Sequence, residues 1–129
     1  MNREKALKIL LVVLGLLFVA GVYPLVTTIQ SSWQANNEDA GPMMLSLYVT
    51  LGIFLLVAAR NPPANRSVIA FTAWSSFAHG AVMAVMAVHI ASTRTGLLIA
   101  AAVLGITGAA LIVLAPAKQS GERDAAAGA

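Results

Sequence analysis

The segment Gly96–Ala115 reads GLLIAAAVLGITGAALIVLA and contains no charged side chain. At 1.5 Å per residue, a helix of this length spans about 30 Å, the thickness of the hydrocarbon core of a bilayer. Three more apolar stretches of similar length precede it: Leu7–Ile29, Met43–Ala59 and Val68–Ile90. No Asp, Glu, Lys or Arg lies in the interior of any of the four, and a charge at mid-bilayer is costly. The sequence therefore predicts an all-α integral membrane protein that forms a four-helix bundle.

The composition favours the lipid bilayer as the chief partner of the chain. Apolar residues make up 59% of the sequence and charged residues 10%, whereas a soluble domain carries about 25% charged residues. Four apolar runs in 129 residues leave too little polar surface to cover a water-soluble core. The net charge is only +3 and the basic residues form no dense patch, so we expect no nucleic-acid partner.

The basic residues predict the orientation of the chain. Seven of the eight Lys and Arg residues lie at or before the start of the first stretch, between the second and third, or after the fourth: Arg3, Lys5, Lys8, Arg60, Arg66, Lys118 and Arg123. Arg94 alone lies on the opposite side. Because basic residues concentrate in cytoplasmic loops, both termini are expected in the cytoplasm, which is an N-in/C-in topology.

Prolines and polar residues divide the chain. Residues 1–117 are expected to form the transmembrane domain, and residues 118–129 a flexible cytoplasmic tail. Pro24 is expected to kink the first helix, because proline removes a backbone donor. Ser31–Pro42 is expected to be a polar outer loop, and Asn61–Asn65, with its two prolines, a rigid inner turn.

Small residues indicate where helices pack, since association in lipid depends on close backbone approach. They recur every three or four residues in the third stretch, at Ala73, Ser76, Gly80, Ala84 and Ala87, and in the fourth, at Ala101, Gly105, Gly108 and Ala109. We expect these stripes to face each other or another helix of the bundle. A dimerisation face is the alternative. Four residues on the opposite side of the third stretch are expected to face lipid: Trp74, Phe77, Val85 and Val88.

Polar groups at membrane depth gather around His79. At 100° per residue, four residues lie on the side of the third helix that carries His79: Thr72, Ser75, Met83 and Met86. The outer halves of the first two stretches add Tyr23, Tyr48 and Thr50. An intramembrane ionisable side chain is a functional candidate, so these residues predict a narrow polar pocket that opens outward.

Four roles for His79 compete. With Met83, Met86 and His89 it supplies soft ligands suited to Cu(I), although ten residues separate the two histidines on one helix. It is also a candidate axial ligand for haem, or a hydrogen-bonding partner for a quinone-like or lipid-like molecule. The fourth role, a neutral histidine bonded to a hydroxyl on a neighbouring helix, requires no cofactor, and we prefer it.

Motifs for catalysis are missing from the sequence. It contains no cysteine, no glycine-rich phosphate loop, no HExxH and no paired carboxylates. The sequence therefore predicts a non-enzymatic membrane protein: a homo-oligomer or an accessory subunit of a larger membrane complex. The alternative is a binding or transport module for a small hydrophobic ligand or metal, with its pocket around His79.

The segment Tyr48–Met83, YVTLGIFLLVAARNPPANRSVIAFTAWSSFAHGAVM, resembles a family of small bacterial four-span membrane proteins known only as a domain of unknown function. The resemblance includes Gly21–Leu25 and Leu114–Lys118, and it is most specific at Thr72–His79. It implies a bacterial inner-membrane protein and carries no activity. The layout is also loosely similar to that of DoxX-like four-helix proteins.

Overall fold

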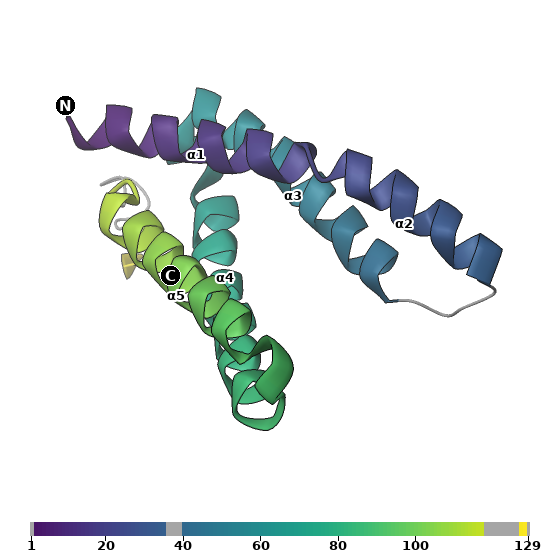
Figure 1. The fold of residues 1–129 in the computed structure, drawn as a ribbon. Helices are drawn as coiled ribbons and strands as arrows, with labels where there is room; N and C mark the ends of the chain where they lie inside the picture. Colours follow the sequence, from purple (N-terminus) through teal and green to yellow (C-terminus); the bar gives the residue numbers. More distant parts are fainter. Residues whose placement is uncertain (1, 36–39, 118–126, 129) are drawn as a thin grey trace.

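The computed structural model describes residues 2–35, 40–117 and 127–128. Every element of regular structure in these ranges that is longer than one residue is a helix (Figure 1). The helices are α1 (Arg3–Val19), α2 (Val22–Ala35), α3 (Gly41–Arg60), η1 (Pro62–Asn65), α4 (Arg66–His89), η2 (Ala91–Thr93) and α5 (Arg94–Leu114). The predicted tail, residues 118–129, lies outside the described residues except for 127 and 128.

Four helical segments are long and apolar enough to cross a membrane. They comprise 33 residues at Arg3–Ala35, 20 at Gly41–Arg60, 28 at Pro62–His89 and 24 at Ala91–Leu114. The prediction of an all-α chain with four apolar helices of spanning length is confirmed. The first segment would extend about 50 Å if it were straight, so its polar end at Gln30–Ala35 reaches past a hydrocarbon core of about 30 Å.

The predicted outer loop, Ser31–Pro42, is wrong at both ends. α2 continues to Ala35, and Pro42 lies in the first turn of α3, where a proline needs no donor. The hydroxyls of Ser31 and Ser32 donate to the carbonyl of Thr28 at 2.9 and 2.8 Å. The helix therefore satisfies these polar side chains internally, which composition alone does not indicate.

Pro24 breaks the first span, and the break lies one turn before the proline. Because Pro24 has no N–H, the carbonyl of Ala20 lacks its helical partner and accepts from the Tyr23 N–H at 3.3 Å. The Gly21 N–H donates to the Phe18 carbonyl at 3.0 Å, which is a tighter turn than an α-helix. The chain bends there, between α1 and α2 (Figure 1).

The helices form two antiparallel hairpins. α1 and α2 run along α3, and α4 runs along α5 (Figure 1). The hairpins meet at the end that carries η1 and the start of α1, and they diverge from there (Figure 1). The predicted bundle is therefore open on one side, between α3 and α4.

The core lies where the hairpins meet. Leu7 and Leu11 of α1, Leu55 of α3, Ile69 of α4 and Leu111 of α5 are each at most 1% exposed. All four spanning segments therefore contribute to one apolar cluster at this end, which we call the junction.

Glycines set the closest approach within each hairpin. A Cβ on Gly52 would lie 2.9 Å from the Gly15 carbonyl oxygen and from the Val19 nitrogen. In the other hairpin, a Cβ on Gly108 would lie 2.9 Å from the Ala73 carbonyl oxygen. These contacts involve backbone atoms that cannot move independently, so each crossing requires the absence of a side chain.

The structure brings most of the predicted small-residue stripes together between α4 and α5. Ser76, Gly80 and Gly108 are buried there, and Ala84 is half-buried. Gly105 is not at this contact, since a Cβ there would meet nothing within 4 Å. Trp74, Val85 and Val88 are exposed as predicted, but Phe77 is half-buried because its ring packs on Gly108.

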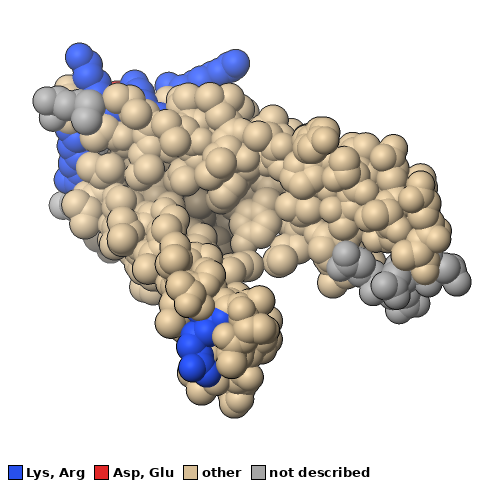
Figure 2. Space-filling view, in the orientation of Figure 1, with Lys and Arg blue, Asp and Glu red and all other residues tan. Residues whose placement is uncertain are grey.

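Positive charge is concentrated at the junction. Five of the six Lys and Arg residues in the described ranges lie at the helix ends that meet there: Arg3, Lys5, Lys8, Arg60 and Arg66. Figure 2 shows this cluster at one end and a single blue patch at the far tip of the α4–α5 hairpin. Arg94, at the start of α5, donates to the Ala87 carbonyl at 2.8 Å and so caps the end of α4.

Candidate functional site

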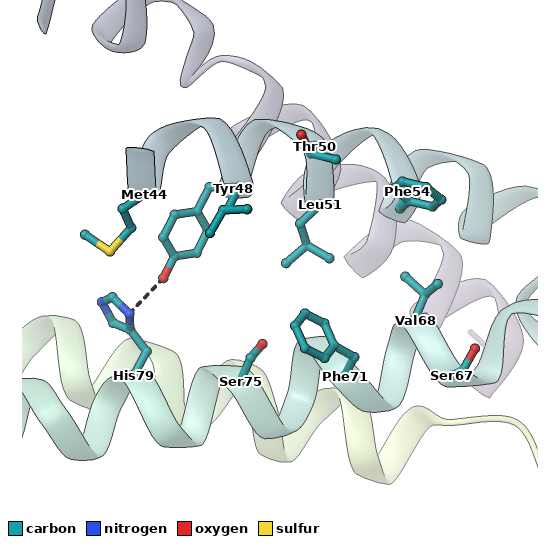
Figure 3. Close-up of a pocket in the computed structure, with 11 residues that line it drawn as sticks. Met44, Tyr48, Thr50, Leu51, Phe54, Ser67, Val68, Phe71, Ser75 and His79 are labelled. Carbon is teal, nitrogen blue, oxygen red and sulfur yellow. Dashed lines mark hydrogen bonds between the residues drawn. The ribbon is translucent and has the colours of Figure 1, made fainter. Parts of the chain in front are cut away.

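A cleft of about 610 Å³ opens between α3 and α4, where the two hairpins diverge (Figure 3). Six of its residues come from α3: Met44, Leu47, Tyr48, Thr50, Leu51 and Phe54. The other five come from α4: Ser67, Val68, Phe71, Ser75 and His79. The walls are mainly apolar, and the polar atoms of two aromatic side chains, Tyr48 and His79, lie at one end (Figure 3).

Residues 61–65, which we call the elbow, connect α3 to α4 at the end of the cleft nearest the junction. Asn61 accepts from the Ala64 N–H at 3.4 Å, and the Asn65 side chain donates back to the Asn61 carbonyl at 2.9 Å. Pro62 begins η1 and is buried. Two prolines and these side-chain bonds fix the chain direction between the helices, so α4 leaves the junction at an angle to α3.

Tyr48 and His79 form a hydrogen bond across the cleft. The Tyr48 hydroxyl lies 2.9 Å from His79 Nδ1, and the two rings meet edge to face at 5.8 Å (Figure 3). The ring of Phe18 packs edge to face on Tyr48 at 5.2 Å, so the bend between α1 and α2 lies behind the pair. This arrangement positions the phenol toward α4.

The pair offers one donor hydrogen to a ligand, whichever tautomer His79 adopts. If Nδ1 accepts from the Tyr48 hydroxyl, the His79 Nε2–H is the remaining donor. If Nδ1–H donates to the Tyr48 oxygen, the phenolic O–H is the remaining donor. A molecule with an acceptor oxygen therefore complements the pair in both states.

Two other hydroxyls of the cleft, those of Thr50 and Ser75, bond to their own helices. Thr50 donates to the Ser46 carbonyl at 2.9 Å, and Ser75 donates to the Thr72 carbonyl at 3.2 Å. Each oxygen keeps acceptor capacity, but its hydrogen is already in use. These hydroxyls make the walls slightly polar without adding donors for a ligand.

Half of the predicted pocket residues line this cleft. His79, Ser75, Tyr48 and Thr50 do so. The other four are Thr72, Met83, Met86 and Tyr23, and none of them lines it. Thr72 is 1% exposed and donates to the Val68 carbonyl at 2.8 Å, whereas Tyr23 is 78% exposed. Met83 and Met86 lie beyond His79 on α4, away from the junction.

Sequence reasoning missed the apolar walls. Met44, Leu47, Leu51 and Phe54 recur every three or four residues on α3, and Val68 and Phe71 do so on α4. That spacing is a signal for one helix face, but it is the same signal that a buried packing face gives. Only the divergence of the helices makes these faces line a cleft.

The four proposed metal ligands all lie on α4, and His79 and His89 are ten residues, or about 15 Å of helix, apart. Within residues 2–35 and 40–117, no three side chains from His, Cys, Asp and Glu come together as a metal-binding group. His89 ends α4 and is exposed, and Met86 is 42% exposed. His79 Nδ1 is already bonded to Tyr48, which leaves Nε2 as its other ring nitrogen.

Comparison with known families identifies residues 2–127 as a match to a family of unknown function, DUF6632. The chain belongs to this family. The match includes every helix described above and the cleft between α3 and α4. It confirms the predicted resemblance to a family without an assigned function. No curated protein and no solved structure matches the chain.

Proposed function

We propose that this protein is a non-enzymatic, intramembrane binding protein for a lipid-soluble molecule with an acceptor oxygen. The observation that carries the proposal is the Tyr48–His79 hydrogen bond at one end of an apolar cleft. In a membrane-spanning segment, an ionisable side chain facing a cavity is a functional candidate. The pair supplies the specific contact, and the walls supply the apolar contact area.

The size and lining of the cleft suit such a ligand. Its volume of about 610 Å³ lies within the range of small-molecule pockets, about 300–1,000 Å³. Phe54, Phe71 and Leu51 offer broad apolar surfaces, while His79 and Tyr48 lie together at one end. An elongated molecule with one polar head, such as a quinone or a neutral lipid, matches this distribution.

The bilayer itself offers a path to the cleft. The cleft lies between two hairpins, and each hairpin consists of two segments that are long and apolar enough to span a membrane. Figure 2 shows a hollow between the two hairpins that opens away from the junction. A lipid-soluble ligand therefore reaches Tyr48 and His79 laterally, without crossing an aqueous channel.

The direct test is the ligand content of purified protein. Wild-type protein and the His79→Ala, Tyr48→Phe and His89→Ala variants are purified from native membranes in mild detergent, extracted with organic solvent and analysed by mass spectrometry. His89→Ala is the matched control, because it removes an exposed histidine of the same helix that does not line the cleft. Wild type and His89→Ala should carry the same molecule, and His79→Ala and Tyr48→Phe should carry markedly less. Equal ligand content in all four proteins, or none in wild type, would refute the proposal.

We further propose that the protein lies in the bacterial cytoplasmic membrane with both termini in the cytoplasm. The charge cluster at the junction supports this orientation, because it collects the basic ends of α1, α3 and α4 on one side. Reporter fusions at each terminus test the topology. Termini on opposite faces would exclude it.

A second candidate role is a homo-oligomer or an accessory subunit of a membrane complex. The observation that favours it is an outward face of small residues on α5, formed by Ala102, Gly105 and Ala109, with open space beside Gly105. The chain has no cysteine, so Gly105→Cys introduces a single cross-linking site. Disulfide-linked dimers in native membranes would support this role, and an exclusively monomeric product would exclude this face as a self-association site.

A further inference from the structure

A second cavity, of about 400 Å³, lies between α4 and α5 at the junction end. Its residues include Arg66 and Ser67 at the start of α4, Ala115 just past α5, and the apolar side chains of Ile69, Trp74 and Ile112. We propose that this groove binds an anionic phospholipid, with the phosphate at the arginines and an acyl chain against the apolar wall. This site is independent of Tyr48 and His79, neither of which lines it.

Two guanidinium groups lie at the same end of the groove. Arg66 forms part of its wall, and Ala115 is another wall residue. Arg3 Nη2 donates to the Ala115 carbonyl at 2.7 Å, which fixes the first turn of α1 beside the end of α5. Guanidinium groups suit phosphate oxygens because they present planar, paired donors.

Basic side chains outnumber acidic ones among the described residues at this end. Glu4 is the one carboxylate among residues 2–35 and 40–117, and it pairs with Lys8 at 2.7 Å. Figure 2 shows the basic side chains gathered at this end. The local charge therefore favours an anionic partner, and basic pockets between membrane helices on the cytoplasmic side bind anionic headgroups.

The groove has the polarity profile of a lipid. Arg66 is the first residue of α4, and Trp74 follows about 12 Å further along the helix at 1.5 Å per residue. Beyond Ser67 the wall is apolar, with Ile69 and Ala73 on α4 and Leu111 on α5. A headgroup at the arginines would place an acyl chain along this wall, with the ring of Trp74 at its deep end.

The fluorescence of Trp74 can be used to measure lipid binding in the groove. The chain has two tryptophans, and Trp33 is highly exposed at the end of α2, so Trp33→Phe leaves Trp74 as the only indole. The Trp33→Phe protein is reconstituted into phosphatidylcholine vesicles that contain chain-brominated phosphatidylglycerol or, separately, chain-brominated phosphatidylcholine at the same mole fraction. Bromine quenches indole fluorescence on contact, so the ratio of the two quenching curves gives the relative affinity.

Brominated phosphatidylglycerol should bind about fivefold more tightly than phosphatidylcholine, the factor expected for one basic side chain at an anionic surface. Arg66→Gln in the same background should remove most of this preference, and Arg66→Lys should keep part of it. The matched control is Lys5→Gln with Arg60→Gln, which removes two charges from the same end but no groove residue. This control should retain the preference.

Three outcomes would overturn the proposal. One is equal quenching by the two lipids in the Trp33→Phe protein. This result does not depend on the folding of any other variant. Another is loss of the preference in the Lys5/Arg60 control as well as in Arg66→Gln, since that would indicate general surface attraction. The third is displacement of brominated phosphatidylglycerol by dissolved glycerol 3-phosphate, which would assign the site to a soluble phosphate compound.

Discussion

The junction and the cleft use the same kinds of apolar side chain for opposite purposes. Leu55 of α3 is fully buried at the junction, whereas Leu47, two turns earlier on the same helix, is 72% exposed and lines the cleft. The difference arises from the neighbouring helix: α4 is close to α3 near η1 and departs from it further along. In a bilayer, an apolar side chain has apolar neighbours whether it contacts another helix or lipid tails. Helix packing alone therefore separates a core from a binding surface.

The largest expected effect comes from filling the tightest contact near the junction. Gly52→Leu places a side chain where even a Cβ would lie 2.9 Å from backbone atoms of α1. Overpacking of this kind costs about 3 kcal/mol or more, because the two helices must separate. The free energy of unfolding in detergent, measured by SDS titration, should fall by that amount. Gly105→Leu is the matched control, since open space lies beside Gly105, and an equally large loss there would contradict the assignment of the crossing.

Shortening a buried side chain at the junction should lower the free energy of unfolding by less. Shortening a side chain in the cleft wall should hardly change it. Leu55→Ala removes a fully buried side chain and should cost about 2 kcal/mol, chiefly through lost van der Waals contacts. Leu47→Ala removes the same atoms from an exposed wall and should change the unfolding free energy by less than about 0.5 kcal/mol. Thermal denaturation of both variants in the same detergent checks the contrast. Similar losses for the two would mean that the cleft is packed shut.

The hydrogen bond between Tyr48 and His79 should contribute less to the free energy of unfolding than the buried side chains of the junction do. Tyr48→Phe removes the bond to His79, and hydrogen bonds between membrane helices are worth about 0.6 kcal/mol. A double-mutant cycle with His79→Ala isolates this coupling energy. A coupling energy near zero would show that the two side chains do not bond across the cleft in the membrane.

The sequence predicted the helices well because lipid imposes strict conditions on them. Charge-free stretches of spanning length require helices, and the prolines at Asn61–Asn65 and Pro116 mark where helices end. Ser31–Ala35 was misassigned to a loop because serines that bond back to Thr28 remain helical. The bend at Ala20–Gly21 follows from Pro24, because proline has no N–H to donate to the Ala20 carbonyl four residues earlier.

The pairing of helices was harder to predict. Small residues indicated contact between the third and fourth spans, but the Gly15–Gly52 crossing was missed because single glycines in apolar helices carry little signal by themselves. His79 and Tyr48 were both candidates for the pocket, yet nothing in their spacing pairs residues on separate helices. The cleft exists because α3 and α4 diverge, a feature set by the elbow and the junction together.

We infer that α3 and α4 stay apart in the bilayer and leave a cleft between them. Because the chain has no cysteine, spin labels can be placed by single substitutions at Met43 and His89, the distal ends of α3 and α4, and at Arg60 and Arg66 beside the elbow. Pulsed electron–electron double resonance of the two doubly labelled proteins in vesicles measures the distal separation and the separation at the elbow. We predict a distal separation well beyond the elbow separation. A distal separation equal to that of packed helices, about 10 Å between axes, would show a closed bundle without this cleft.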